Sequence, residues 1–238
     1  GCGGAAALAG VMVLGAREGR FGRRGEKKSM QPFAASSIPL VTLGTFLLWF
    51  GWFGFNGFSQ LAMGTFDDVN AISKIAVNTH LAGAAGTVTG AALTRLLGGK
   101  TDIVMMLNGA LAGLVAITAE PLTPGPITAM IIGSIGAVIM YFGTKMLEGF
   151  GIDDVVGAIP VHMFAGIFGT LVVPFTNGDT SFGTQFVGTL SVVLFSFVLS
   201  YLVFIAMKAT IGLRISKAAE KLGTDKAEIG VVAYSIRD

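Results

Sequence analysis

The stretch WFGWFGFNGFS at residues 49–59 closes a run that carries no charged residue between Lys28 and Asp67. On a helix, Trp52, Phe55 and Ser59 share one face, because they are spaced by three and four residues. Two aromatic rings and a hydroxyl on one face can hold a small cation by cation–π attraction and one hydrogen bond. The alternative is that these aromatic residues form a belt at a membrane surface or face lipid.

The composition is typical of a membrane protein. The 238 residues are 53% hydrophobic and only 13% charged, whereas soluble domains carry about 25% charged residues. The charge-free runs are near or above the ~20 residues with which a helix spans a bilayer. We therefore predict an all-α polytopic membrane protein in which a helical region, residues 1–211, precedes a charged tail, residues 212–238. The predicted spans lie at about 38–59, 71–97, 102–119, 127–147, 155–174 and 183–208, after an apolar segment at 1–16.

The basic residues predict how the chain is oriented. With alternating spans, all but one of the 16 Lys and Arg residues fall on the side that holds loop 17–28 and the tail. The opposite side holds Lys74 and several acidic residues. Because basic residues concentrate on the cytoplasmic side of membrane proteins, we expect loop 17–28 and the C-terminus to be cytoplasmic.

His162 is the candidate for chemistry within the membrane. The helical rise puts it ~10 Å from the inner end of the span predicted at 155–174, near the middle of a ~30 Å hydrocarbon core. An ionisable residue at that depth is costly and indicates function. Neutral imidazole donates from one nitrogen and accepts at the other, which suits a small polar guest. The alternative is a structural histidine that faces protein, the interpretation that we favour for His80.

The residues before His162 predict how its helix begins. Asp153 and Asp154 complement the dipole at a helix N-terminus and can cap it. Pro160 lies inside the predicted helix, lacks an N–H group, and is expected to kink it.

Other kinds of site find no support in the sequence. The single cysteine, Cys2, allows neither an internal disulfide nor a cysteine metal site. The sequence holds no Ser/His/Asp triad pattern, phosphate loop or HExxH pattern. We therefore expect no enzymatic activity, no catalytic residue, no metal, no cofactor and no nucleic-acid partner.

Three segments resemble motifs of one known family. GWFGFNGFS at 51–59, NGALAGLV at 108–115, and the Asp pair at 153–154 with Val-His at 161–162 are similar to motifs of the Amt/Mep/Rh ammonium transporters, in the same order. Residues 1–17 resemble the end of the family signature, immediately after its own histidine. The resemblance covers the whole chain but only the C-terminal half to two-thirds of a typical member. We therefore expect the chain to lack roughly the first five helices.

The resemblance implies a fold and a set of site residues. A family protomer has eleven helices and a narrow apolar pore, and assembles as a homotrimer. This chain would supply the second inverted repeat and the last helix. By motif position, Trp52 and Ser59 match the outer recruitment site for ammonium, Phe55 matches one of two stacked phenyl gates, and His162 matches the second histidine of the pore. Gly157 stands where many members have an acidic residue.

The implied function is transport of ammonium or methylammonium across the plasma membrane. Entry of a bare ion into an apolar tube is costly, and aromatic rings at the mouth partly replace its water. Loss of a proton removes most of that cost, so potassium, which has no proton to lose, is rejected.

Two alternatives stay open at the sequence level. One is an ammonium sensor that acts on a signalling partner through tail 212–238. The other is a truncated fragment that conducts nothing. The tail loosely resembles the family element that meets a trimeric PII-type signalling protein.

Overall fold

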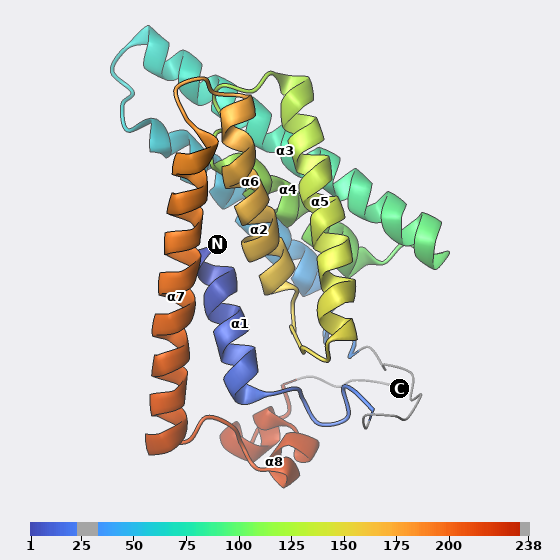
Figure 1. The fold of residues 1–238 in the computed structure, drawn as a ribbon. Coiled ribbons are helices and arrows are strands. Elements are labelled where there is room, and N and C mark those ends of the chain that lie inside the picture. The colour runs from blue at the N-terminus through green and yellow to red at the C-terminus, as the bar shows by residue number, and fades with distance from the viewer. Residues whose placement is uncertain (23–32, 234–238) are drawn as a thin grey trace.

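The computed structural model of the chain describes residues 1–22 and 33–233 (Figure 1). Helices account for all the regular structure in these residues, which contain no strand, so the all-α prediction is confirmed. The α-helices are α1 (Cys2–Leu14), α2 (Ile38–Gly57), α3 (Phe66–Gly98), α4 (Ile103–Thr118), α5 (Pro126–Gly149), α6 (Ala165–Val172), α7 (Phe182–Thr210) and α8 (Lys217–Leu222). Short 3₁₀ or π segments are η1 (Phe58–Gln60), η2 (Ile159–Phe164), η3 (Val173–Phe175) and η4 (Asp225–Ile229).

Each range predicted to span the membrane contains helix. The largest differences are two helix starts, at Phe66 instead of 71 and at Ile159 instead of 155. α3 starts early because Thr65 and Asp68 form a capping box, in which each side chain accepts a hydrogen bond from the other's backbone N–H at 3.1 Å. Residues 23–28 of the predicted cytoplasmic loop and 234–238 of the tail lie outside the described residues.

Glycines bring the backbones of α3, α4 and α5 into contact. Gly86 of α3 and Gly109 of α4 face each other, and a Cβ on Gly109 would lie 2.5 Å from the carbonyl oxygen of Gly86. A Cβ on Gly133 of α5 would overlap the carbonyl of Ala82 in the same way. We call Gly86, Gly109, Gly113 and Gly133 the glycine seam; such small residues allow close helix packing inside membranes.

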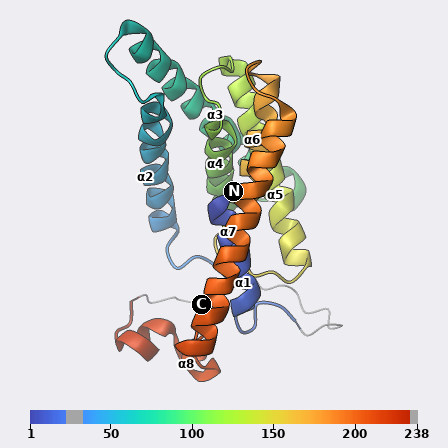
Figure 2. The ribbon, with the colours of Figure 1, turned by 60° about the vertical axis from the view of Figure 1, so that its left-hand side comes forward.

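Figures 1 and 2 show where the other helices lie. α1 runs along one part of α7, α6 lies beside another part, and α8 lies near the end of α7. By length and composition, α2, α5 and α7 can each cross a membrane. In the most apolar 18 residues of α2 and of α7 only 6% are buried, against 44% in α5, so α2 and α7 present wide apolar faces.

Candidate functional site

The end of α2 brings together the three residues that the sequence singles out. The rings of Trp52 and Phe55 form an edge-to-face pair, with centroids 6.0 Å apart and planes at 68°. Ser59 follows in η1, where its hydroxyl donates to the backbone carbonyl of Phe55 at 2.8 Å. Both Phe55 and Ser59 are exposed. This row therefore offers one free ring face and a hydroxyl oxygen that can still accept a hydrogen bond.

Trp52 is fixed by α4. Its indole N–H donates to the hydroxyl of Thr118 at 2.7 Å, and that hydroxyl donates to the carbonyl of Leu114 at 2.6 Å. The ring also packs against an apolar cluster built from α4, α5 and the segment that carries His162. That cluster consists of Leu111, Ala112, Leu114, Met140, Val161 and Ala165. This one cluster thus connects Trp52 to Val161, just before His162 in the chain, and to Ala165, just after it.

His162 lies in η2, which continues directly into α6. Its neighbours Val161 and Met163 are buried, and the histidine itself is partly buried. Within residues 1–22 and 33–233, no side chain or backbone group forms a hydrogen bond with the imidazole. Gly4 of α1 packs so closely on this segment that a Cβ there would lie 2.5 Å from the backbone nitrogen of Met163. His162 is therefore a partly buried imidazole next to α1, and its own backbone carbonyl accepts a hydrogen bond from the amine of Gly1 at 3.3 Å.

Asp154 determines where the His162 helix begins. Its carboxylate accepts hydrogen bonds from the backbone N–H groups of Gly157, Ala158 and Ile159, at 3.1, 3.0 and 2.7 Å. A carboxylate at this place also complements the helix dipole. The chain turns at Gly157 with φ +78°, in the left-handed region that favours glycine. The capping role predicted for the acid pair is thus confirmed for Asp154.

Two expectations about this segment are wrong. Pro160 does not kink the helix, because the helix begins only at Ile159 and the proline occupies the first turn, where no N–H is needed. Asp153 does not cap the helix, because its carboxylate is paired with two arginines, Arg17 and Arg20.

In the ion pair between Arg17 and Asp153, the Asp153 side chain is buried, whereas Arg17 is partly exposed. Arg17 Nε and Nη2 each donate at 2.8 Å, one to each carboxylate oxygen, and the Arg17 backbone N–H donates at 2.9 Å. Only 2% of the Asp153 side chain is exposed. Burial alone would raise the pKa of Asp153, but hydrogen bonds from Arg17 and the charges of Arg17 and Arg20 hold this pKa below its usual value. The carboxylate is therefore ionised at neutral pH.

His80 lies on the exposed side of α3. Its ring contacts two aromatic residues of α2, with centroid distances of 5.4 Å to Trp49 and 6.2 Å to Phe53. The indole N–H of Trp49 is buried and has no hydrogen-bond partner among the described residues. His80 is nevertheless exposed, and its structural role stays a prediction.

The tail contacts the segment that follows α1. Arg214 donates to both carboxylate oxygens of Glu220 at 2.9 Å, and to the carbonyl of Leu14 at 3.2 Å. The backbone N–H of Glu18 donates to Glu220 at 2.7 Å. Hydrogen bonds from Glu18 and Arg214 lower the pKa of Glu220. A cavity of about 870 Å³ lies between this segment, Phe33 and the tail.

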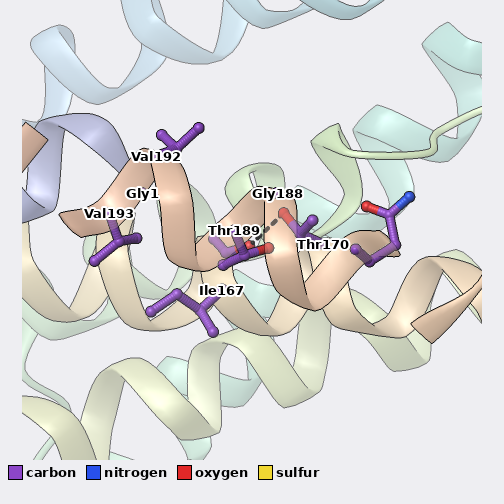
Figure 3. Close-up of a pocket in the computed structure, with 9 residues that line it drawn as sticks. Gly1, Ile167, Thr170, Gly188, Thr189, Val192 and Val193 are labelled. Carbon is purple, nitrogen blue, oxygen red and sulfur yellow. Dashed lines mark hydrogen bonds between the residues drawn. The ribbon is translucent and has the colours of Figure 1, made fainter. Parts of the chain in front are cut away.

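A smaller cavity, of about 180 Å³, lies between α6, α7 and Gly1 (Figure 3). Thr170 lines it and donates to the carbonyl of Gly166 at 3.0 Å. Gly166 lies one helical turn beyond His162. Thr189 of α7 lines it as well, and its hydroxyl is buried without a partner among the described residues. Thr170 on α6 and Thr189 on α7 thus contribute hydroxyl groups to a lining that is otherwise mostly apolar.

Comparison with known proteins places these features in a family. The sequence profile described as Ammonium Transporter Family matches residues 1–234. The chain belongs to the ammonium transporter family. Ammonium transporter Amt2 of Archaeoglobus fulgidus is 39% identical to this family member over 252 residues, which cover 98% of the chain and 52% of that relative. A putative ammonium transporter of Synechocystis is 38% identical over 232 residues, covering 96% and 52%.

Solved structures agree with the family assignment. A structure described as a sensor Amt protein has a TM-score of 0.86 at 32% identity, covering 95% of this ammonium-transporter chain and 57% of the other. Candida albicans Mep2 has a TM-score of 0.79 at 29% identity, covering 95% and 53%. The chain spans about half the length of the relatives that it matches. The ammonium-transporter fold predicted from the motifs is thus confirmed.

Sequence reasoning missed the polar contacts that position this family member's histidine helix. Arg17 and Asp153 are separated by 136 positions in the chain, and no periodic pattern connects them. The amide of Asn108 donates to the carbonyl of Val156 at 3.0 Å, a contact that the NGALAGLV motif alone does not indicate. One signal of these contacts is present in the sequence: basic residues within 17–20 and acidic residues within 148–154.

Proposed function

We propose that this chain forms part of an ammonium-conducting pore. Ammonium would be recruited at the outer aromatic site with Trp52 and Ser59, pass the Phe55 gate, lose its proton, and move past His162 as the neutral amine. Membership of the family and the motif positions support this proposal. The observation that carries it is the imidazole of His162, which is partly buried and has no hydrogen-bond partner among the described residues.

The physical basis of the proposed selectivity is desolvation. An ion that enters an apolar tube gives up its hydration, which the rings at the mouth replace only in part. Ammonium escapes that cost by giving up a proton, and the imidazole can accept from, or donate to, the remaining amine. Potassium has no such route.

The membrane arrangement belongs to the same proposal. The six spans, at about 38–59, 71–97, 102–119, 127–147, 155–174 and 183–208, would alternate across the membrane. Loop 17–28 and tail 212–238 would then both be cytoplasmic, as the distribution of basic residues suggests. The protomer would assemble into a homotrimer, each copy with its own pore.

A second candidate is an ammonium sensor. It is favoured by the likeness to the solved structure described as a sensor Amt protein. An ion pair between Lys217 and Glu18, at 3.4 Å, and hydrogen bonds from Glu18 and Arg214 hold the tail on the end of α1 and the segment after it. A change there can reach a cytoplasmic partner such as a PII-type protein. Ammonium-dependent binding of that partner, in a protein that moves no ammonium, would decide for the sensor.

The test of the transport proposal replaces His162 by Ala in the protein as its gene encodes it. We expect ammonium uptake, or its selectivity over potassium, to fall by at least about tenfold, equivalent to ~1.4 kcal/mol. His80→Ala is the matched control, because His80 is the other histidine of the chain. Uptake of methylammonium and potassium into liposomes, at equal protein content, measures both quantities. Unchanged uptake and selectivity in His162→Ala would refute the role given to His162.

A further inference from the structure

Two contacts hold α1 against the helix that carries His162. One is the close approach of Gly4 to Met163, the residue directly after the histidine. The other is the ion pair between Arg17, three residues beyond the end of α1, and Asp153, six residues before the start of η2. The first contact fixes how closely the two segments approach, and the second fixes where they lie along each other.

The geometry of the ion pair between Arg17 and Asp153 is specific. Its two side-chain hydrogen bonds form a fork, which orients the carboxylate as well as attracting it. The backbone N–H of Arg17 adds a third bond, so the main chain as well as the long side chain is held. Because Asp153 is almost completely buried, water does not compete for it.

The position of Asp153 is passed directly to the histidine helix. The next residue, Asp154, caps the helix through three backbone N–H groups that end at Ile159. His162 is three residues further on, within the first turn. A shift of the Asp153 carboxylate therefore moves the cap, and a moved cap rotates or translates the first turn.

We propose that Arg17 is a positioning residue: through Asp153 it fixes the start of the histidine helix and thereby the place of the His162 imidazole relative to α1 and Trp52. This inference deepens the proposed pore function and rests on it only for its transport readout. Arg17 and Asp153 touch no substrate in this scheme.

The variants distinguish a displaced His162 imidazole from a general loss of protein stability. Arg17→Met removes the fork and leaves Asp153 with Arg20, whose Nε lies 3.4 Å away. Asp153→Asn removes the charge from the other side. The double variant leaves no unpaired buried charge, and Arg20 keeps its ion pair with Glu148 at 2.9 Å. Arg17→Lys retains one charged hydrogen bond without the fork.

The control is Lys145→Met. It breaks an ion pair of 3.3 Å within α5, between Lys145 and Glu148, which is connected to Asp153 only indirectly, through Arg20. All variants are made in the protein as its gene encodes it, and each is compared at equal amount and after its thermal stability has been measured.

Two readouts are taken. The first is selectivity, as the ratio of ammonium to potassium flux into liposomes. We expect this ratio to fall about tenfold in Arg17→Met and in the double variant, because small misplacement of a functional group is costly. Arg17→Lys should lie in between, and Lys145→Met should match the wild type. Persistence of the loss in the double variant at normal stability identifies positioning.

The second readout does not depend on transport. Nuclear magnetic resonance of ¹⁵N-labelled histidine in lipid, assigned with His162→Gln, reports the surroundings of the imidazole. We expect the His162 signal to move in Arg17→Met and in the double variant, while that of His80 stays. An unmoved His162 signal, or recovery of selectivity in the double variant, would overturn the inference. A wild type that moves no ammonium would refute the proposed function alone, since the signals still decide on Arg17.

Discussion

The glycine seam and the charged contacts around Arg17 and Glu220 hold segments of the chain together in opposite ways. In the seam, Gly86 and Gly109 allow backbone to touch backbone, and no side chain intervenes. At the other place, hydrogen bonds that involve charged side chains join segments far apart in the chain: Arg17 donates to Asp153, the Glu18 backbone donates to Glu220, and Arg214 donates to the Leu14 carbonyl. We call Arg17, Glu18, Asp153, Arg214 and Glu220 the polar junction. The seam is rigid because nothing in it can adjust, whereas the junction depends on ionisation and salt.

This difference indicates where the molecule can respond to conditions. A backbone contact between apolar helices does not change with pH or ionic strength. Ion pairs with exposed members weaken as salt rises, because the Debye length falls to ~3 Å at 1 M. The junction therefore gives the tail a contact that can be released while the seam keeps the fold.

The largest effect on stability is expected when a side chain is introduced into the glycine seam. Gly86→Ala places a methyl group against the carbonyl of Gly109, and backbone on both sides prevents relaxation. We expect a loss of about 3 kcal/mol in the free energy of unfolding, the upper part of the usual range for overpacking. Thermal unfolding in detergent or lipid measures it.

The matched control is Gly51→Ala on α2. A Cβ there meets nothing within 4 Å, and alanine favours helix over glycine by up to about 1 kcal/mol. Gly51→Ala should therefore be neutral or stabilising. Equal destabilisation by both substitutions would mean that the seam is not specially close-packed.

A smaller effect is expected where one hydrogen bond joins α2 to the seam helices. Trp52→Phe removes the indole donor to Thr118 and should cost about 1 kcal/mol. Trp49→Phe, one turn earlier, removes a buried donor that has no partner among the described residues, and should cost nothing or stabilise. Both variants lose the same indole area, so the difference between their unfolding midpoints measures the hydrogen bond from Trp52 to Thr118. A larger loss in Trp49→Phe would contradict this reading of α2.

Much of the fold could be predicted from the sequence, because its signals are local. Charge-free runs locate the helices, and the spacing of Trp52 and Phe55 predicts their common side of α2. The start of α3 was misplaced because the Thr65 capping signal precedes the apolar run. The start of the His162 helix was misplaced because the Asp154 cap acts across five residues, through the turn at Gly157.

The polar junction could not be predicted for a different reason. Its partners come from three distant parts of the chain, and opposite charges alone do not say which will pair. Asp153 and Asp154 look equivalent in sequence, yet one forms an ion pair and the other caps a helix. Only the folded positions of α1 and the histidine helix separate them.

The smallest effect is expected at the exposed end of the junction. Glu220→Gln removes the charge that accepts from the Glu18 backbone N–H and from Arg214, and should loosen the tail from the segment after α1 without changing the unfolding of the helices. Because the folded pKa of Glu220 is lowered, its contribution is complete above the ordinary glutamate pKa near ~4.3 and is lost as the pH falls through the lower folded value. Tail contact should therefore persist at pH 5 to 8.

Hydrogen exchange of residues 214–222 measures that contact. Wild-type exchange should accelerate in 1 M salt, whereas Glu220→Gln should exchange fast at every salt concentration and respond little to it. Exchange within α3 and α4 should stay the same in both proteins, because the seam contains no charge to screen. Salt-induced exchange that is equal in the tail and in the seam helices would mean that the two regions unfold together, and the contrast between them would disappear.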